Sequence, residues 1–216
     1  MILLDHPVQL LPEGAILLTE TQTLVVADLH LGKSAAFRSH GLPVPEGDTA
    51  RDLARLLELA RRHSAREVIV AGDLFHAPSG ITPEIDAEIT NFLQDLAVPF
   101  HLVEGNHDAK IKTLPARLQA LQSMDREGIR IIHDPADAHP APLHIAGHWH
   151  PIARIRDGKR TSLRLPCFLL RENTLILPSF GTFTGGAVIP SESQDRIYVP
   201  LRDRVVEVPQ ELWRKK

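Results

Sequence analysis

Apolar and polar residues follow two different periods along the first two thirds of the chain. Short apolar runs predict strands, which we place at residues 15–18, 23–27, 68–71, 100–103, 129–132 and 143–146. Longer segments predict helices, which we place at residues 48–63, from Thr82-Pro83 onward, and around residues 114–123. Strands that alternate with helices favour a largely parallel sheet.

The helix at residues 48–63 has the clearest pattern. Leu53, Leu56, Leu57 and Ala60 recur at the i, i+3, i+4 and i+7 spacing of one helix face, and charged residues occupy the other face. A loop rich in glycine and proline precedes the helix, and Asp48 is the predicted N-cap. We expect this helix to cover one side of a sheet.

After residue 146 the pattern changes to alternating segments, which predict mostly antiparallel strands at residues 161–165, 167–170, 175–177 and 196–199. The two patterns together predict an α/β fold, a layered αββα sandwich of two mixed β-sheets flanked by helices. The chain has 216 residues, of which 43% are hydrophobic, enough to bury the core of one domain. We therefore expect a single domain over residues 1–216.

Charge and cysteine content narrow the function classes. A net charge of −3 argues against a protein that coats nucleic acid, although a basic strip follows residue 150. This strip either follows a nucleic-acid backbone or simply faces solvent, and it comprises Arg154, Arg156, Lys159, Arg160, Arg164 and Arg171. The lone Cys167 and the lack of a leader-like start predict a cytoplasmic protein. No apolar run reaches the roughly 18 residues that a membrane span needs, so no membrane association is expected.

Short polar fragments follow the predicted strands. They are Asp28-Leu-His30, Gly72-Asp73, Gly105-Asn-His-Asp108, His133 and Gly147-His-Trp-His150. Asp-x-His alone is more often a turn or a helix cap than a metal site. The presence of all these fragments in order, each at a predicted strand end, makes coincidence a poor explanation.

The residue types of these fragments suit two adjacent divalent ions. Asp28, His30 and His150 are predicted to bind one ion, and Asp73 is predicted to bridge both. The second ion takes Asn106, His133 and His148. Histidine, carboxylate and amide ligands without a thiolate favour manganese, iron or zinc over magnesium or calcium, and manganese is the leading prediction.

Two other histidines compete with the predicted ligands. His133 is preferred for the fourth fragment because it ends a strand, and His139 is its rival. His144 lies inside the predicted strand at residues 143–146, so we expect it to pack within the sheet.

The predicted site suits phosphoester hydrolysis. A hydroxide that bridges two ions is nucleophilic, because coordination lowers the pKa of water from 15.7 to roughly 7. His107 is the predicted general acid for the leaving oxygen, and Asp108 is predicted to orient its imidazole.

Substrate contacts are predicted for four neighbours of the ligands: Lys33, Arg38, His76 and Trp149. Each has a plainer alternative. The charged or polar side chains are often simply solvated, and Trp149 is at least as well explained by packing against the sheet.

The ordered fragments resemble those of the calcineurin-like metallophosphoesterase superfamily, and all five of its motifs are present. The resemblance implies the metallophosphoesterase fold, the ligand assignment given above and His107 as the catalytic histidine. Further segments are similar to the bacterial ligase-associated DNA-damage-response phosphoesterases, the PdeM family. They are His30-Leu-Gly-Lys33, Gly41-Leu-Pro-Val-Pro45, Leu165-Pro-Cys-Phe168 and the stretch 177–186.

The resemblance to the PdeM family implies a manganese-dependent phosphodiesterase or endonuclease that acts on DNA during repair, with a DNA ligase and a helicase as partners. Two other hypotheses remain open from the residues alone. One is a phosphomonoesterase or small-molecule phosphodiesterase that uses the same two-metal site. The other is a metal-binding scaffold without turnover, which the presence of His107 disfavours.

Overall fold

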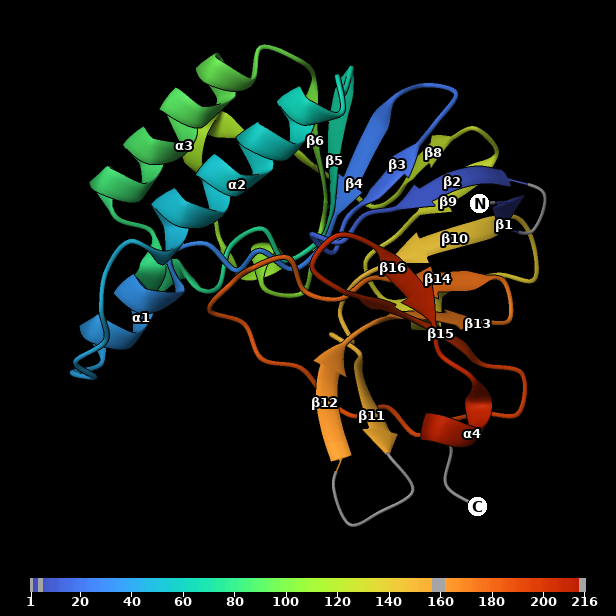
Figure 1. Ribbon diagram of the computed structural model, residues 1–216. Coiled ribbons are helices and arrows are strands. Elements are labelled where there is room, and N and C mark those ends of the chain that lie inside the picture. Colours follow the sequence, from blue (N-terminus) through green and yellow to red (C-terminus); the bar gives the residue numbers. More distant parts are fainter. Residues whose placement is uncertain (1, 4–5, 157–161, 214–216) are drawn as a thin grey trace.

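Two large sheets packed face to face form the centre of the protein (Figure 1). The computed structural model describes residues 2–3, 6–156 and 162–213. Within these residues each large sheet has seven strands, and a two-stranded hairpin lies beside them. This arrangement confirms the predicted fold of two mixed β-sheets flanked by helices.

The first sheet has the strand order β1 to β7. Its strands are β1 (Ile2–Leu3), β2 (His6–Leu10), β3 (Ile16–Leu18), β4 (Thr23–Val26), β5 (Glu67–Ala71), β6 (Phe100–Val103) and β7 (Ala120–Leu121). The strands β4, β5, β6 and β7 pair in parallel, and β1 to β4 pair antiparallel. The carboxyl ends of the parallel strands therefore meet at one edge.

The second sheet has the order β16-β15-β13-β14-β10-β9-β8. Its strands are β8 (Met124–Arg126), β9 (Ile129–Ile131), β10 (Leu143–Ala146), β13 (Phe168–Arg171), β14 (Thr174–Ile176), β15 (Arg196–Pro200) and β16 (Val205–Glu207). β10 pairs in parallel with β9 and β14, whereas the other pairings are antiparallel. The hairpin is formed by β11 (Ile152–Arg156) and β12 (Ser162–Pro166), so the predicted Thr161 lies outside the described residues.

Hydrophobic layers hold these elements together. Leu24 and Val70 of the first sheet pack against the helices α2 (Asp48–Arg62) and α3 (Pro83–Leu96), which cover its outer face (Figure 1). Val25 and Ile145, from different sheets, belong to the layer between the sheets. A third cluster lies against the second sheet, where the hairpin and the short α4 (Gln210–Trp213) contribute. No helix among the described residues is long and apolar enough to cross a bilayer.

The predicted helix at residues 114–123 is wrong. This stretch contains a single 3₁₀ turn, Pro115–Arg117, followed by β7. Ala116 and Arg117 have φ values of 52° and 55°, and a left-handed backbone ends a helix before it can propagate. Ala120 and Leu121 instead extend the sheet by pairing with β6.

The helix α2 confirms the pattern at residues 48–63, but Asp48 is not its N-cap. Gly47 occupies that position with φ at 92°, and Asp48 is the first helical residue. The Asp48 carboxylate instead accepts a hydrogen bond from the Ser34 N–H at 3.2 Å. Ser34 belongs to α1 (Lys33–Ser39), a helix that the sequence pattern did not predict.

Candidate metal centre

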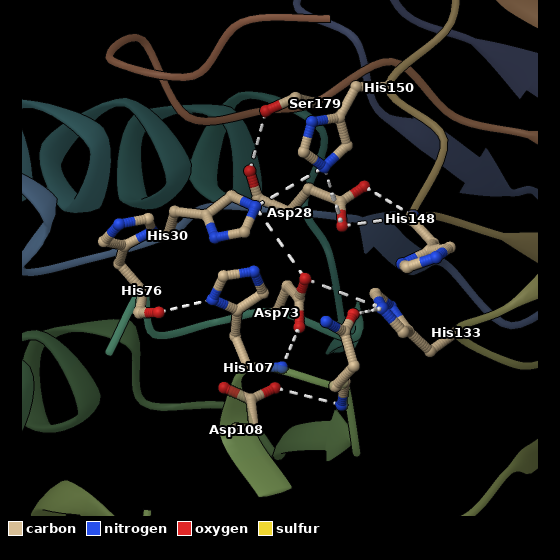
Figure 2. Close-up of polar contacts among 12 residues, drawn as sticks. Asp28, His30, Asp73, His76, His107, Asp108, His133, His148, His150 and Ser179 are labelled. Carbon is tan, nitrogen blue, oxygen red and sulfur yellow. Dashed lines mark hydrogen bonds and ion pairs between the residues drawn. The ribbon is translucent and has the colours of Figure 1, made fainter. Parts of the chain in front are cut away.

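The predicted metal ligands converge between the two sheets (Figure 2). We call this set the ligand cluster, and it comprises Asp28, His30, Asp73, Asn106, His133, His148 and His150. The first four follow β4, β5 and β6 of the first sheet, and the last three follow β9 and β10 of the second. Each sheet therefore supplies part of the site.

One half of the ligand cluster contains Asp28, His30 and His150, whose ligand atoms lie within 4.8 Å of one another. The His150 Nε2 is 3.3 Å from the Asp28 Oδ1 and 3.4 Å from the His30 Nε2. Asp28 and His30 are buried, and His150 is partly exposed. These three side chains form the more enclosed half of the site.

The other half of the ligand cluster contains Asp73, His133 and His148. The Asp73 Oδ2 lies 3.6 Å from the His133 Nε2, and the same oxygen lies 3.8 Å from the His30 Nε2 of the first half. The Asn106 Oδ1 is 3.0 Å from the His133 Nε2. Asp73 thus lies between the two halves, as a bridging carboxylate must.

Backbone carbonyls orient two of the ligand histidines. His133 donates from Nδ1 to the Ala71 carbonyl, and His150 donates from Nδ1 to the Gly185 carbonyl, each at 3.1 Å. A carbonyl only accepts, so the proton of each neutral ring resides on Nδ1. The Nε2 lone pair is then available to a metal, which is the usual arrangement of a ligating histidine.

The donor set fits divalent ions. Burial raises the pKa of the Asp28 carboxyl, although the hydrogen bond and charge of His150 lower it. Burial, followed by the neighbouring His150 and His107, lowers the pKa of His30 to about 2, so this imidazole is neutral. Among the described residues, the buried Nδ1 of His30 has no hydrogen-bond partner. A cation bound beside the neutral His30 ring would offset the desolvation of the buried Asp28 carboxylate.

Five residues of the ligand cluster have a left-handed backbone. The φ values are 56° at Asp28, 51° at His30, 51° at Asp73, 69° at His148 and 45° at His150. This conformation costs a non-glycine residue about 1 to 3 kcal/mol and is common at functional sites. It turns each side chain out of the strand alternation, at the strand ends where the ligands meet.

Two glycines bring the ligand loops close together. A Cβ at Gly147 would lie 2.7 Å from the Asp28 Oδ2 and 2.8 Å from the Ala71 carbonyl oxygen. A Cβ at Gly105 would overlap the backbone nitrogen of Asp73. Both positions require glycine because neighbouring loops occupy the space of a side chain.

His107 lies beside the ligand cluster but is positioned by other groups. Its backbone N–H donates to the Asp73 Oδ1 at 2.8 Å, and its Nδ1 donates to the carbonyl of His76 (Figure 2). Its ring centroid is 4.9 Å from that of His30. The Nε2 of His107 therefore remains free to exchange a proton at the site.

The sequence predicts that Asp108 orients the His107 imidazole, but the Asp108 carboxylate has other partners in the structure. Its buried carboxylate accepts backbone hydrogen bonds from Phe75 at 2.9 Å, Gly105 at 3.1 Å and Leu74 at 3.2 Å. Burial raises the pKa of Asp108 to about 6, while these hydrogen bonds lower it. Asp108 instead ties the loop after β5 to the loop after β6.

A comparison with known families agrees with this geometry. Residues 21–134, which are just over half of the chain, match the model of the calcineurin-like phosphoesterase family. The chain belongs to this family. It is a metal-dependent phosphoesterase with the metallophosphoesterase fold, as the motifs predicted.

Two known proteins are similar to this phosphoesterase. The DNA double-strand break repair protein Mre11 of Archaeoglobus fulgidus is 31% identical over 109 residues, which are 49% of this chain and 24% of that protein. The match thus spans about a quarter of that relative's length. The crystal structure of nuclease MPE from Pseudomonas putida has a TM-score of 0.77 and 32% identity, covering 94% of this chain and 96% of that chain.

Two of the predicted substrate contacts, His76 and Lys33, lie beside the ligand cluster. The ring of His76 stacks on that of His107 with centroids 5.3 Å apart. Lys33 begins α1, and burial lowers the pKa of its half-buried ammonium, while the charge of Asp48 raises it. The charge of Lys33 also contributes to lowering the pKa values of His30 and His76, so Lys33 lies near both rings.

The other two predicted contacts have different neighbours. Arg38 pairs with Glu46 at 3.2 Å and donates to the Pro45 carbonyl, so it holds the proline loop. Trp149 packs against the apolar cluster on the second sheet, with the Arg171 guanidinium 5.4 Å from its ring centroid. The structure therefore favours the packing explanation for Trp149.

His139 and His144, the alternatives to the predicted ligand histidines, lie outside the ligand cluster. His144 is fully buried in β10. The ring centroids of His139 and His144 are 6.3 Å apart. Asn173 donates to the His139 carbonyl at 2.6 Å. These contacts agree with sheet packing for His144 and leave His133 as the ligand candidate.

The described members of the basic strip have different surroundings. Arg171 forms ion pairs with Asp195 and Glu192, both at 2.7 Å, so its charge is neutralised. Arg154 and Arg164 are exposed and lie opposite each other in the pairing of β11 with β12. Lys159 and Arg160 lie outside the described residues.

Sequence reasoning missed several contributors to the site. The Gly185 carbonyl orients His150, and Ser179 donates to the Asp28 carbonyl at 2.8 Å. Phe37 and Phe183 flank Lys33. The stretch 177–186 carries a family resemblance, but nothing in its local pattern indicates that it reaches β4 and α1.

Proposed function

We propose that this phosphoesterase is a two-metal phosphodiesterase that cuts DNA as an endonuclease during DNA repair. The observation that carries this proposal is the pair of ligand groups that meet at Asp73. A shared carboxylate between two sets of histidines is the arrangement that holds adjacent divalent ions. The ions, when bound, neutralise phosphate oxygens and lower the pKa of water, so that a nucleophile forms near neutral pH.

The ligand cluster binds and spaces the ions in this proposal. Asp28, His30, Asp73 and His150 hold one ion, and Asp73, Asn106, His133 and His148 hold the other. Manganese is the proposed metal, with iron and zinc as alternatives, because the site has four histidines and no thiolate.

His107 is the proposed general acid. Its Nδ1 is committed to the His76 carbonyl, so the leaving oxygen would take its proton from Nε2. Lys33 and His76 are the proposed substrate contacts. The His76 ring stacks on His107 and contacts Phe37, and the Lys33 Nζ lies 6.0 Å from the ring centroid of Phe37. Asp108 positions the loop that carries His107 rather than the ring itself.

DNA is the proposed substrate because of the known relatives. A nuclease is similar over nearly the whole chain, and a double-strand break repair protein is similar over half of it. The resemblance to ligase-associated phosphoesterases extends the proposal to a DNA ligase and a helicase as partners. The buried free thiol of Cys167 fits the cytoplasmic location proposed for such a protein.

The test compares substrates and metals on the same purified enzyme. Metal-free protein is loaded with Mn²⁺, Fe²⁺ or Zn²⁺, and metal content is measured by elemental analysis. Turnover is then measured on bis(p-nitrophenyl) phosphate, p-nitrophenyl phosphate and a covalently closed plasmid. We expect two ions per chain, cleavage of the diester, and nicking of the plasmid with Mn²⁺.

The alternatives give different results. Faster cleavage of the monoester than of the diester would identify a phosphomonoesterase. Cleavage of the aryl diester without nicking of closed plasmid or cutting of linear DNA would identify a small-molecule phosphodiesterase. Titration with a purified DNA ligase during size-exclusion chromatography tests the proposed partner, and separate elution at micromolar concentration would contradict it.

A further inference from the structure

A pocket of about 460 Å³ lies where the β11–β12 hairpin, α4 and the second sheet meet (Figure 1). We call it the hairpin pocket. Ala153 of β11, Leu169 of β13 and Ile197 of β15 form its buried apolar floor, and each is at most 4% exposed. Trp213 of α4 and the segment 188–190 line its sides. No member of the ligand cluster lines the hairpin pocket, so the two sites are separate.

Two arginines of β11 give the hairpin pocket a positive charge. Arg154 and Arg156 both line it, because residues two apart in a strand share a face. Within the described part of the chain neither guanidinium forms an ion pair, and Arg154 donates only to the Ser162 Oγ, at 3.3 Å. The buried Asp195 also lines the pocket, but its carboxylate already accepts from Arg171 at 2.9 and 2.7 Å. The two arginines are therefore available to an anion.

The chemistry of the hairpin pocket suits binding rather than catalysis. The thiol of Cys167 lines it, and burial raises the pKa of this thiol to about 12, although a backbone hydrogen bond with Ala153 lowers it. The thiol therefore stays protonated and unreactive. The alanine, leucine and isoleucine of the floor have no polar group that could read the edge of a nucleobase or a sugar. The floor suits an aliphatic group.

Two segments outside the described residues directly follow elements that line the hairpin pocket. Residues 157–161 follow β11 and read Asp-Gly-Lys-Arg-Thr, and residues 214–216 follow α4 and read Arg-Lys-Lys. Neither segment contains a large apolar side chain, and both have a net positive charge. An apolar floor beside two unpaired guanidinium groups does not suit either of them.

One side of the hairpin pocket continues into the ligand cluster. Ile152, which lines the pocket, follows the ligand His150 by two residues and donates to the Ala187 carbonyl at 2.8 Å. The Ala187 N–H donates in turn to the His150 carbonyl at 3.1 Å, and the His150 Nδ1 donates to the Gly185 carbonyl. The segment 188–190 begins directly after Ala187. A ligand that shifts this segment would therefore also shift the backbone that orients His150.

We propose that the hairpin pocket is a regulatory site for a small aliphatic carboxylate. The aliphatic body would cover the apolar floor, and Arg154 and Arg156 would bind the carboxylate. Charge-assisted hydrogen bonds of this kind are stronger than neutral ones. The volume of the pocket lies in the range that takes a small molecule. This site goes beyond the proposed function, because it is separate from the metal centre and takes no part in phosphoester cleavage.

The first experiment compares three probes that share one alkyl chain and differ in their head group. Decanoate, decan-1-ol and decyltrimethylammonium are each titrated into the full chain by isothermal titration calorimetry. We expect one decanoate to bind per chain. Decan-1-ol should bind about 10-fold or more weakly, because it cannot form charge-assisted hydrogen bonds with the arginines. The cationic probe should not bind.

Two changes in the hairpin pocket should separate the roles of its floor and its charge. Ala153→Leu fills the floor and should weaken decanoate and decan-1-ol alike, by about 10-fold or more. The double variant Arg154→Gln/Arg156→Gln should lower decanoate affinity to that of decan-1-ol and leave decan-1-ol unchanged. The matched controls are Ala50→Leu, on the exposed face of α2, and the exposed Arg204→Gln, and both should bind as the unmodified chain does.

The regulatory role is tested by linkage with the metal centre. Decanoate affinity is measured on metal-free and on Mn²⁺-loaded protein, and Mn²⁺ affinity is measured with and without decanoate by electron paramagnetic resonance of the free ion. We expect each ligand to change the affinity of the other by the same factor, about 5-fold or more. The double arginine variant should lose this coupling at the same decanoate concentration.

Specific results would overturn this inference. Equal affinities for decanoate and decan-1-ol would show that no carboxylate site exists. Undiminished decanoate binding by a folded Ala153→Leu would place the ligand elsewhere. If Ala153→Leu melts far below the unmodified chain, the double arginine variant decides, and undiminished decanoate binding by that variant would contradict the site. Equal decanoate affinity with and without Mn²⁺ would overturn the regulatory role. None of these measurements uses turnover, so they do not depend on the substrate proposed above.

Discussion

The ligand cluster lies beside a row of four aromatic rings in successive contact, which we call the aromatic row: His107, His76, Phe37 and Phe183. The two regions are built in different ways. The ligand cluster is formed by loops at strand ends, with five residues in the left-handed region and two carboxylates buried. The outer half of the aromatic row uses a helix, which carries Phe37, and a long loop, which carries the exposed Phe183. The first region is fixed by backbone geometry, and the second by side-chain contacts with α2.

This difference separates two tasks. Residues in the ligand cluster should affect every phosphoester alike, because all substrates need the same ions. Residues at the outer end of the aromatic row should affect only substrates that extend to them. Variants that change both regions equally would contradict this division.

The largest expected effect belongs to Asp73→Asn. The neutral amide removes the negative charge shared by the two halves of the ligand cluster, so we expect turnover to fall by about 10³-fold or more on all substrates. Elemental analysis should show fewer than two bound ions. Asp125→Asn, an exposed aspartate paired with Arg130, is the control and should keep both metal and activity. A metal-loaded, active Asp73→Asn would remove Asp73 from its bridging role.

A smaller effect is expected for His107→Ala, which should bind two ions but lose about 10² to 10⁴ in rate. If the ring donates a proton to the leaving oxygen, the loss should grow as the leaving group becomes more basic. Methyl p-nitrophenyl phosphate and bis(p-nitrophenyl) phosphate should therefore be less affected than DNA. A loss that is independent of the leaving group would point to a role in positioning alone.

Gly147→Ala should have a moderate effect on activity. The new Cβ would approach the Asp28 Oδ2 and force the two ligand loops apart, so metal affinity or kcat should fall by about 10- to 100-fold. Gly41→Ala is the control, since its φ of 81° makes alanine costly but nothing lies within 4 Å of the new Cβ. Both variants should melt earlier, and only Gly147→Ala should lose activity. Loss of activity in Gly41→Ala would show that stability, rather than the close approach, controls turnover.

The smallest effect is expected for Glu67, which joins the two sheets away from both regions. Arg126 of β8 donates to both carboxylate oxygens of Glu67 on β5, at 2.6 and 2.8 Å. These hydrogen bonds and the Arg126 charge lower the pKa of Glu67 below its usual 4.5, although burial raises it. The carboxylate therefore stabilises the fold above pH 4.5, and this contribution is lost as the pH falls below that value.

Glu67→Gln should accordingly lower the free energy of unfolding by about 1 kcal/mol at pH 7 and by less at pH 3.5. Denaturant unfolding at the two pH values measures the difference. Glu207→Gln, which breaks an exposed pair with Arg196 within one sheet, should cost less. Both variants should keep metal binding and substrate preference, and a change in either would link the sheet interface to the site.

Local patterns predicted most of the fold. The apolar runs that end at Ala27, Ala71, Val103 and Ala146 form strands, because each is largely buried and leaves little choice of structure. The helix at 114–123 failed because its apolar spacing competed with a left-handed backbone and with pairing to β6. The helix α1 was missed because its stability comes from contacts with α2 rather than from its own pattern.

The sequence by itself predicted the donor set and the strand ends that carry it, and its motifs indicated the family. Those features are local in the chain. The predicted ligands follow buried strands, and a glycine directly precedes Asp73, Asn106 and His148. Only the tertiary structure decided which groups orient the donors. The His76 and Gly185 carbonyls, and Leu74 and Phe75 among the backbone partners of Asp108, come from distant segments. The position of Phe183 beside Lys33 was likewise decided by α2, because no spacing within 177–186 encodes a contact with residues 33–37.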